Sequence, residues 1–304
     1  MQSRRTFIQQ MASAAALSGV SSFGLWSCAK PETKKITILH TNDVHSQIDP
    51  LPANHYKYPG LGGFARRATL IEQIRKENPN TILLDAGDIF QGTPYFNYYG
   101  GELEFKLMSK LGYDIATIGN HDFDNGIEGL FGQLPNANFE FVSANYDFKN
   151  TVLDGYVKPY KVIVKDEVKI GVFGLGVELQ GLVNQNLYKE TKYLNPIEIA
   201  EETVRVLKEY EQCDIIICLS HIGYSYDNPD KVCDLTLARK TKDIDLIIGG
   251  HTHTLLPKPE LVDNAAGNKV LINQCGKSGV YMGQIDFYLD SRGNKQTEGR
   301  SIQV

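Results

Sequence analysis

Short apolar runs recur along the chain after Pro31, and polar loops or longer segments separate them. These runs predict strands at Ile36–His40, Thr81–Leu84, Asp114–Ile118, Phe139–Ser143, Lys169–Leu175, Asp214–Leu219, Ile244–Ile248 and Val270–Asn273. Most of the runs are continuously apolar, which is typical of strands that are buried on both faces. The pattern therefore places most strands in the interior of the protein.

Two other segments predict antiparallel pairing. Tyr160–Val164 and Val168–Phe173 flank the polar triplet Lys165-Asp166-Glu167, as the two strands of a hairpin would. Val280–Leu289 alternates more regularly between apolar and polar positions, which favours an antiparallel strand.

Helical segments lie between the predicted strands. Gly63–Asn78 has apolar residues at helical spacing, and Asn195-Pro196-Ile197-Glu198 combines a cap residue, a first-turn proline and an acid at the third position. That helix is predicted to run to about Tyr210, and Asn228-Pro229 predicts another helix start of the same kind. Alternating strands and helices indicate the α/β class with a mixed sheet, in one domain from about residue 33 to 304.

The first 32 residues are predicted to be an export signal with a short linker. Ser3-Arg4-Arg5-Thr6-Phe7-Ile8 precedes a weakly apolar run to about Trp26, which resembles a twin-arginine signal; the alternative is a disordered basic start followed by a helix. Leu25-Trp26-Ser27-Cys28 resembles a bacterial lipidation box, although Trp26 departs from the pattern. We expect a periplasmic or cell-envelope location, with either lipidation at Cys28 or ordinary cleavage nearby.

The composition is that of a globular enzyme without affinity for nucleic-acid polymers. The 304 residues are 42% hydrophobic and 22% charged, with a net charge of −5. This balance provides no basic surface for a nucleic-acid backbone, but bound cations would still admit a small anionic ester. Cys213, Cys218, Cys233 and Cys275 show no CxxC spacing, so we expect buried free thiols rather than a zinc site, with a disulfide as the alternative.

Five polar clusters each follow a predicted strand directly. They are Asp43-Val44-His45, Gly87-Asp88, Gly119-Asn120-His121-Asp122, His221, and Gly250-His251-Thr252-His253. Loops at the carboxyl ends of strands are where α/β folds build their sites. Each cluster alone is a weak signal, but their repetition at successive strand ends predicts a metal centre. His40 and His55 lie outside the clusters and are given no role.

The ligand types indicate the metals. Asp, Asn and His without Cys suit divalent Mn, Zn, Fe or Mg. Two such ions roughly 3.5–4 Å apart can hold both the phosphoryl oxygens and the attacking water of an in-line displacement. Asp88 is the natural bridging carboxylate, because its two oxygens can each face one ion.

Taken together, these motifs resemble the calcineurin-like metallophosphoesterases. Ile38-Leu39-His40-Thr41-Asn42-Asp43-Val44-His45, Gly62-Gly63-Phe64-Ala65-Arg66 and Gly119-Asn120-His121-Asp122-Phe123-Asp124 are similar to the 5′-nucleotidase and UDP-sugar hydrolase branch. The resemblance covers essentially the whole chain after the predicted signal. It implies an α/β/β/α sandwich with mixed sheets.

The resemblance also implies roles for single residues. One ion would be held by Asp43, His45, Asp88 and His253, and the other by Asp88, Asn120, His221 and His251. The family often has Gln or Asn where this chain has His253. His121 would stabilise the transition state and protonate the leaving oxygen, and Asp124 would orient its ring and raise its pKa.

The implied activity is hydrolysis of phosphate esters, foremost 5′-nucleotides, by metal-activated water. The alternatives are a phosphodiesterase, a UDP-sugar pyrophosphatase, or a metal-binding subunit that needs a separately encoded nucleotide-binding domain. Members of this branch have a second, C-terminal domain whose aromatic pair sandwiches the base, and no such segment is seen before Val304. We therefore expect a separate partner chain, or else a different substrate. Tyr95, Phe96, Tyr98 and Tyr99 near Asp88 are predicted to be a packed loop rather than a base platform.

Overall fold

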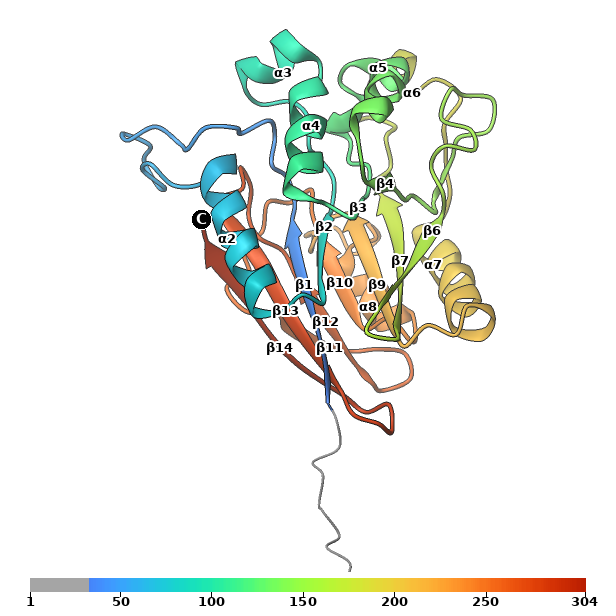
Figure 1. Ribbon diagram of the computed structural model, residues 1–304. Coiled ribbons are helices and arrows are strands. Elements are labelled where there is room, and N and C mark those ends of the chain that lie inside the picture. The colour runs from blue at the N-terminus through green and yellow to red at the C-terminus, as the bar shows by residue number, and fades with distance from the viewer. Residues whose placement is uncertain (1–32) are drawn as a thin grey trace, which may run out of the picture. The chain divides into compact units, whose positions relative to one another are not determined.

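The computed structural model describes residues 33–304, and residues 34–304 form one compact unit. Two six-stranded sheets lie face to face in this unit, with helices on the outer side of each (Figure 1). The predicted export signal and Cys28 lie outside the described residues. Within those residues, no helix has the length and hydrophobicity that a membrane span requires.

The first sheet has the strand order β14-β13-β1-β2-β3-β4. β1, β2, β3 and β4 run parallel, whereas β13 is antiparallel to both β1 and β14. This confirms the antiparallel strand predicted from the alternation at Val280–Leu289. The strands span Lys34–Thr41 (β1), Thr81–Asp85 (β2), Ile115–Ala116 (β3), Glu140–Phe141 (β4), Tyr281–Leu289 (β13) and Lys295–Gln303 (β14).

The second sheet has the strand order β11-β12-β10-β9-β7-β6. Its central strands β12, β10, β9 and β7 are parallel, and antiparallel strands close both edges. The edge pair β6 and β7 is the predicted hairpin. The strands span Tyr160–Lys165 (β6), Val168–Gly176 (β7), Ile215–His221 (β9), Leu246–Gly249 (β10), Glu260–Asp263 (β11) and Lys269–Asn273 (β12).

The α-helices occupy the two outer layers and the loops at one end of the sheets (Figure 1). They are α2 (Phe64–Glu77), α3 (Pro94–Tyr99), α4 (Glu102–Leu111), α5 (Gly126–Gln133), α6 (Gln185–Tyr188), α7 (Pro196–Arg205) and α8 (Asp234–Lys240). Two 3₁₀ turns, η1 (His121–Phe123) and η2 (Leu134–Asn136), and a π-helical turn, η3 (Val206–Tyr210), add to them, and β5 (Tyr146–Asp147) pairs with β8 (Lys192–Tyr193).

The apolar side chains form layers that follow the alternation along each strand. On β1, Ile36 and Ile38 point between the two sheets, whereas Leu39 points outward to the α2 and α4 layer. On β9, Ile215 and Ile217 fill the same inner layer, whereas Ile216 packs with the α7 and α8 side. This arrangement confirms the α/β/β/α sandwich, because continuously apolar strands bury both of their faces.

Two details of the predicted helices and cysteines can be compared with the structure. The Asn195 side chain accepts a hydrogen bond from the Ile197 backbone amide, which confirms the predicted cap. The helix start predicted at Asn228 is wrong: its side chain accepts from the Asp230 amide in a local turn, and α8 begins only at Asp234. Cys213, Cys218, Cys233 and Cys275 are buried and free, as expected.

The parallel strands bring their carboxyl ends to one edge of the sandwich. β1, β2, β9 and β10 end at Thr41, Asp85, His221 and Gly249, and each leads into or contains one of the polar clusters. The upper end of the sheets in Figure 1, beneath α3 and α5, is therefore where these clusters meet.

Candidate metal centre

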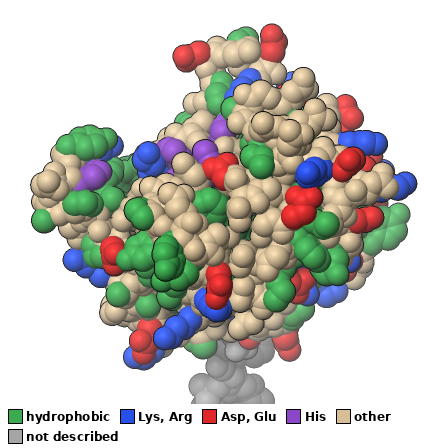
Figure 2. Space-filling view, turned by 90° about the horizontal axis from the view of Figure 1, so that it is seen from above, with side chains coloured by type: hydrophobic (Ala, Val, Ile, Leu, Met, Phe, Trp, Pro, Cys, Tyr) green, Lys and Arg blue, Asp and Glu red, His purple; other side chains and the backbone are tan. Residues whose placement is uncertain are grey.

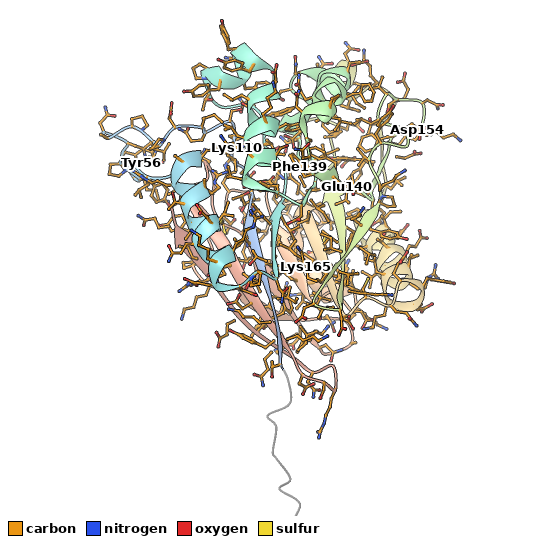
Figure 3. The ribbon with its side chains drawn as sticks, in the orientation of Figure 1. Tyr56, Lys110, Phe139, Glu140, Asp154 and Lys165 are labelled. Carbon is orange, nitrogen blue, oxygen red and sulfur yellow. The ribbon has the colours of Figure 1, made fainter. Side chains whose placement is uncertain are left out.

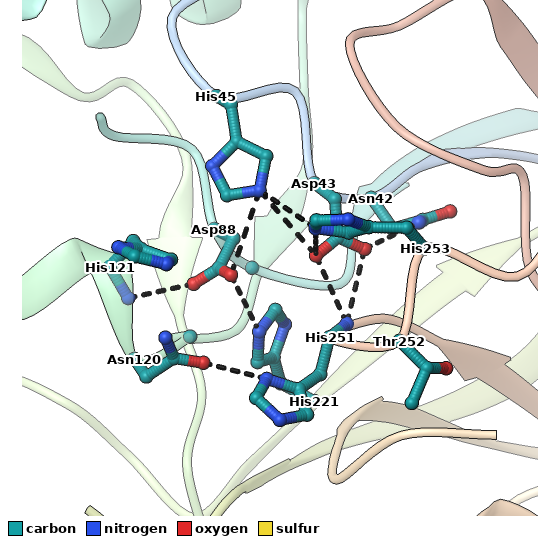
Figure 4. A network of polar contacts seen from close by, with 12 residues as sticks. Asn42, Asp43, His45, Asp88, Asn120, His121, His221, His251, Thr252 and His253 are labelled. Atoms are coloured by element: carbon teal, nitrogen blue, oxygen red, sulfur yellow. Dashed lines mark hydrogen bonds and ion pairs between the residues drawn. The ribbon is translucent and has the colours of Figure 1, made fainter. Parts of the chain in front are cut away.

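Seven side chains from the five clusters converge at this end of the sheets (Figure 4). Figure 2, which looks onto the same end, shows histidine side chains reaching the surface there. Two groups have ligand atoms close enough to hold a cation: Asp43, His45, Asp88 and His253 in one, and Asp88, His221 and His251 in the other. Asp88 belongs to both groups.

The first group is tightly spaced. The Nε2 atoms of His45 and His253 are 3.0 Å apart, and His253 Nε2 is 3.4 Å from Asp43 Oδ1. His45 Nε2 is 3.9 Å from both Asp43 Oδ1 and Asp88 Oδ2. Ligands on bonds of about 2.1 Å at right angles around one ion lie about 3.0 Å apart, so this spacing fits a shared cation.

The second group surrounds the other side of Asp88. His221 Nε2 lies 3.1 Å from Asp88 Oδ2, and Asn120 Oδ1 lies 2.7 Å from His251 Nδ1. His221 Nδ1 is 2.6 Å from the Ala86 carbonyl, so it carries the proton that it donates there. The buried Nε2 atom has no hydrogen-bond partner of its own and faces the Asp88 carboxylate. A buried ring nitrogen without a hydrogen-bond partner beside a carboxylate fits a site that takes a cation.

The backbone at these ligands is unusual. Asp43, His45, Asp88, His251 and His253 all have φ between 49° and 70°, in the left-handed region. Residues other than glycine seldom adopt this conformation, and each instance costs of order 1–3 kcal/mol. Its concentration in these five residues indicates a functional constraint on how the ligands are presented.

Glycines allow the close packing of the loops around the ligands. A Cβ atom on Gly119 would stand 2.2 Å from Asp88 Oδ1, and one on Gly250 would stand 2.7 Å from His221 Nδ1. Any side chain at these two positions would therefore displace a ligand. This is why the Gly-Asn-His-Asp and Gly-His-x-His motifs begin with glycine.

Asp122 fastens two ligand loops to each other. Its fully buried carboxylate accepts backbone N–H groups from Asp88 (3.0 Å), Ile89 (2.9 Å), Phe90 (3.1 Å) and Gly119 (2.8 Å). Burial and the charge of Asp88 raise the pKa of Asp122 to about 7, against the four N–H groups that favour its anion. The sequence motif contains Asp122, but nothing in its spacing reveals this role.

Asn42 supports the first group in a similar way. Its amide donates to Asp43 Oδ2 (2.6 Å) and to the Gly276 carbonyl (2.7 Å), and its oxygen accepts from the Cys275 amide (2.8 Å). The His251 amide also donates to both oxygens of Asp43, at 3.0 and 3.1 Å. Asp43 is thus oriented by its neighbour Asn42, which is itself bonded to the distant residues Cys275 and Gly276, and by the distant His251 amide.

His121 and Asp124 form a pair beside the two groups. His121 Nδ1 is 2.9 Å from Asp124 Oδ2, and this hydrogen bond raises the pKa of His121. The ring stands 5.3 Å from that of His45, and the His121 amide donates to Asp88 Oδ1 at 2.8 Å. The His121 side chain is 37% exposed, so its ring lies against the groups but is open to a substrate.

The charge states of the groups suit cation binding. Burial lowers the pKa of His45, and burial together with the charge of His221 lowers that of His251 to about 4. Although burial opposes it, the positive charge of the His221 imidazolium lowers the pKa of Asp88. Against its burial, Asp88 in turn raises the pKa of His221 to about 10. Metal binds the neutral imidazole and the ionised carboxylate, so an ion would displace a proton from His221.

The remaining two histidines stay outside the site. His40 is buried within β1, where its Nε2 atom lies 3.0 Å from Asn273 Nδ2. His55 lies in the loop before α2 and accepts from the Tyr58 amide. Neither ring contributes to the two groups.

Comparison with known proteins gives a consistent family. The model of the calcineurin-like phosphoesterase family matches residues 36–255. The chain is 35% identical over 295 residues to a snake venom 5′-nucleotidase of Crotalus adamanteus, covering 89% of this chain and 48% of the relative. It is 34% identical over 313 residues to the trifunctional nucleotide phosphoesterase protein YfkN of Bacillus subtilis, covering 92% of this chain and 19% of the relative.

Two solved structures are also similar to most of this chain. A 5′-nucleotidase precursor from Thermus thermophilus superposes with a TM-score of 0.81 at 32% identity, over 89% of this chain and 55% of that one. The NAD nucleotidase of Haemophilus influenzae gives a TM-score of 0.79 at 28% identity, over 90% of this chain and 57% of that one. The chain spans about half the length of these 5′-nucleotidases.

Proposed function

The chain belongs to the calcineurin-like phosphoesterase family of metal-dependent phosphoester hydrolases, and we propose that it hydrolyses 5′-nucleotides with two divalent ions. The observation that carries this proposal is the sharing of Asp88 by two groups of ligand atoms. Asp43, His45, Asp88 and His253 would hold one ion, and Asp88, Asn120, His221 and His251 the other. The donor set fits Mn, Zn, Fe or Mg.

The ions, when bound, would supply positive charge for the phosphoryl oxygens and an activated water for the attack. The protein's own contribution begins with His121. Because its Nδ1 atom faces Asp124, the free Nε2 atom is the one available to the substrate. His121 would neutralise charge on the phosphoryl group and give a proton to the leaving oxygen, while Asp124 fixes the ring.

The loops of the site provide rigidity for this reaction. Asp122 and Asn42 hold Asp88 and Asp43 through backbone and side-chain hydrogen bonds, and both are buried. Ligands held in this way lose little freedom when an ion binds, which favours affinity.

The substrate test uses the full chain loaded with Mn²⁺. AMP, UDP-glucose, a cyclic nucleotide and p-nitrophenyl phosphate are assayed side by side for hydrolysis. Release of phosphate from AMP in preference to the others supports the proposal. Preference for UDP-glucose would identify a UDP-sugar pyrophosphatase, and preference for the cyclic nucleotide a phosphodiesterase.

A second candidate is a catalytic subunit that works with a separate chain. It is favoured by the coverage of only about half of the 5′-nucleotide-cleaving relatives. In this candidate a separately encoded chain supplies the nucleotide-binding domain. Turnover of AMP that appears only when such a chain is added would establish this candidate over the stand-alone enzyme.

We further propose that the chain is exported by the twin-arginine route to the periplasm or cell envelope. After export, it is either anchored by a lipid at Cys28 or cleaved nearby without an anchor. Support comes from Arg4 and Arg5 before a weakly apolar run, and from the Leu25–Cys28 segment. Cell fractionation of an Arg4→Lys/Arg5→Lys variant tests the route, since retention in the cytoplasm is expected. Incorporation of labelled palmitate that is lost in Cys28→Ala would establish the anchor.

A further inference from the structure

A cavity of about 590 Å³ lies between α3 and the segment that carries the His121–Asp124 pair. Its walls include Asn97, Tyr98, Tyr99, Asp124, Asn125 and Gln133. The volume is within the range of roughly 300–1,000 Å³ that is typical of small-molecule sites. A larger cavity of about 740 Å³, beside α2, is lined by none of the candidate ligands or the His121–Asp124 pair.

The aromatic side chains of α3 do not all pack as the sequence suggested. Phe96 is buried and its ring lies 5.2 Å from that of Phe90, which anchors the helix to the core. Tyr98 and Tyr99, however, are 83% and 44% exposed, and their rings meet edge to face at 5.0 Å. The prediction of a packed loop therefore holds for Phe96 and is wrong for the two tyrosines.

Asp124 connects this cavity to the reaction centre. Asp124, whose carboxylate hydrogen-bonds His121 Nδ1, is one of the residues that line the cavity, and the His121 ring lies 5.3 Å from that of the candidate ligand His45. If His121 gives a proton to the leaving oxygen, the alcohol that leaves must lie on the His121 side of the phosphorus atom. The cavity adjoins His121 through Asp124.

We propose that this cavity binds the nucleoside part of the substrate, so that the chain carries its own base-recognition site. The inference rests on the proposed hydrolysis of 5′-nucleotides and adds where the leaving nucleoside lies. Tyr98 and Tyr99 offer flat apolar faces on which a planar base can stack. Asn97, Asn125 and Gln133 supply amide donors and acceptors for the edge of a base or for ribose hydroxyls.

The kinetic test compares two substrates that differ only by the base. AMP and ribose 5-phosphate share the same phosphate ester, but ribose 5-phosphate has nothing to stack. In the full metal-loaded chain, the double variant Tyr98→Ala/Tyr99→Ala should lower kcat/KM for AMP by roughly ten- to a hundredfold, which corresponds to the loss of one stacked base. Its kcat/KM for ribose 5-phosphate and its metal content should stay within twofold of the wild type.

Tyr56→Ala is the matched control. Tyr56 is 92% exposed and lies in the loop that projects from the core beside α2 in Figure 3, and it does not line the cavity. This variant should keep the wild-type preference for AMP over ribose 5-phosphate. An unchanged preference in the double variant would overturn the inference while leaving the proposed hydrolysis of nucleotides intact.

Binding of adenosine to the metal-free protein gives an answer that does not depend on turnover. Saturation-transfer NMR should show adenosine bound by the wild type and by Tyr56→Ala, and lost in the double variant. Equal adenosine signals in all three proteins, or none in the wild type, would overturn the cavity assignment. If adenosine binds as expected but AMP is not hydrolysed with any metal, the proposed function fails and the binding site stands.

Discussion

Replacing Asp122 by Asn removes one acceptor oxygen from the buried carboxylate that fastens the Asp88 and Asn120 loops. Each carboxylate oxygen accepts two of the four backbone N–H groups, so the new amide NH₂ faces two donors that lose their partner. A buried N–H group without a partner costs about 1–3 kcal/mol. We therefore expect the free energy of unfolding to fall by about 2–6 kcal/mol.

The loss of this carboxylate should also weaken metal binding. Because the backbone of Asp88 and Gly119 would shift, both groups of ligands should weaken, with metal affinity reduced by roughly 10- to 100-fold. Urea denaturation of the metal-free protein at pH 8, above the pKa of about 7 that burial and Asp88 give Asp122, measures the stability. Metal analysis after dialysis measures retention.

Asp114→Asn is the control for this experiment. Its carboxylate accepts a single backbone N–H, from Leu83 at 2.8 Å, and it is only partly buried. It should cost about 1 kcal/mol and leave metal binding unchanged. If Asp122→Asn matches Asp114→Asn in both urea midpoint and metal content, the role assigned to Asp122 is refuted.

Three further predictions follow from the site and the core. In metal analysis, Asp88→Ala should lose both ions, whereas His121→Ala should retain both. In steady-state kinetics, His121→Ala should slow turnover by roughly two to four orders of magnitude. Loss of metal from His121→Ala would contradict its assigned role. Chelation with EDTA should lower the Tm, and each ion at about a hundred times its Kd should restore about 2.7 kcal/mol of unfolding free energy; an unchanged Tm would contradict bound metal. Burial lowers the pKa of His40 from 6.5 to about 3. Between these two pH values the unfolded chain binds a proton at His40 and the folded chain does not, so stability is lost as pH falls through that window. The expected loss is about 2 kcal/mol at pH 5. In urea denaturation of the metal-free proteins, the wild type should show this loss and His40→Gln should not. Equal losses in the two proteins would show that His40 is not the cause.

The sequence predicted most of the strands because their positions are dominated by burial. Continuous apolar runs such as Ile244–Ile248 and Asp214–Leu219 correspond to strands at the centre of the second sheet. β14, Lys295–Gln303, was not predicted, because it is a largely polar edge strand held by backbone pairing with β13. The false helix start at Asn228 shows that a local turn can satisfy the same side chain that a helix cap would use.

The candidate site could be predicted in outline but not in its geometry. Strand ends identify which side chains meet, because parallel strands place their carboxyl ends at one edge. The left-handed backbone of His45 and Asp88, and the clamp made by Asp122, depend on loops that are distant in the sequence. The exposure of Tyr98 was also invisible, since an aromatic run looks the same whether it packs or not.

The most direct test of the two-metal account is a titration of the metal-free full chain with Mn²⁺, in which phosphate release from AMP is measured at each addition. Activity should rise until two equivalents are bound and then level off, because both groups of ligands that share Asp88 must be filled. Full activity at one equivalent, or no phosphate release at any Mn²⁺ level with two equivalents bound, would contradict the account.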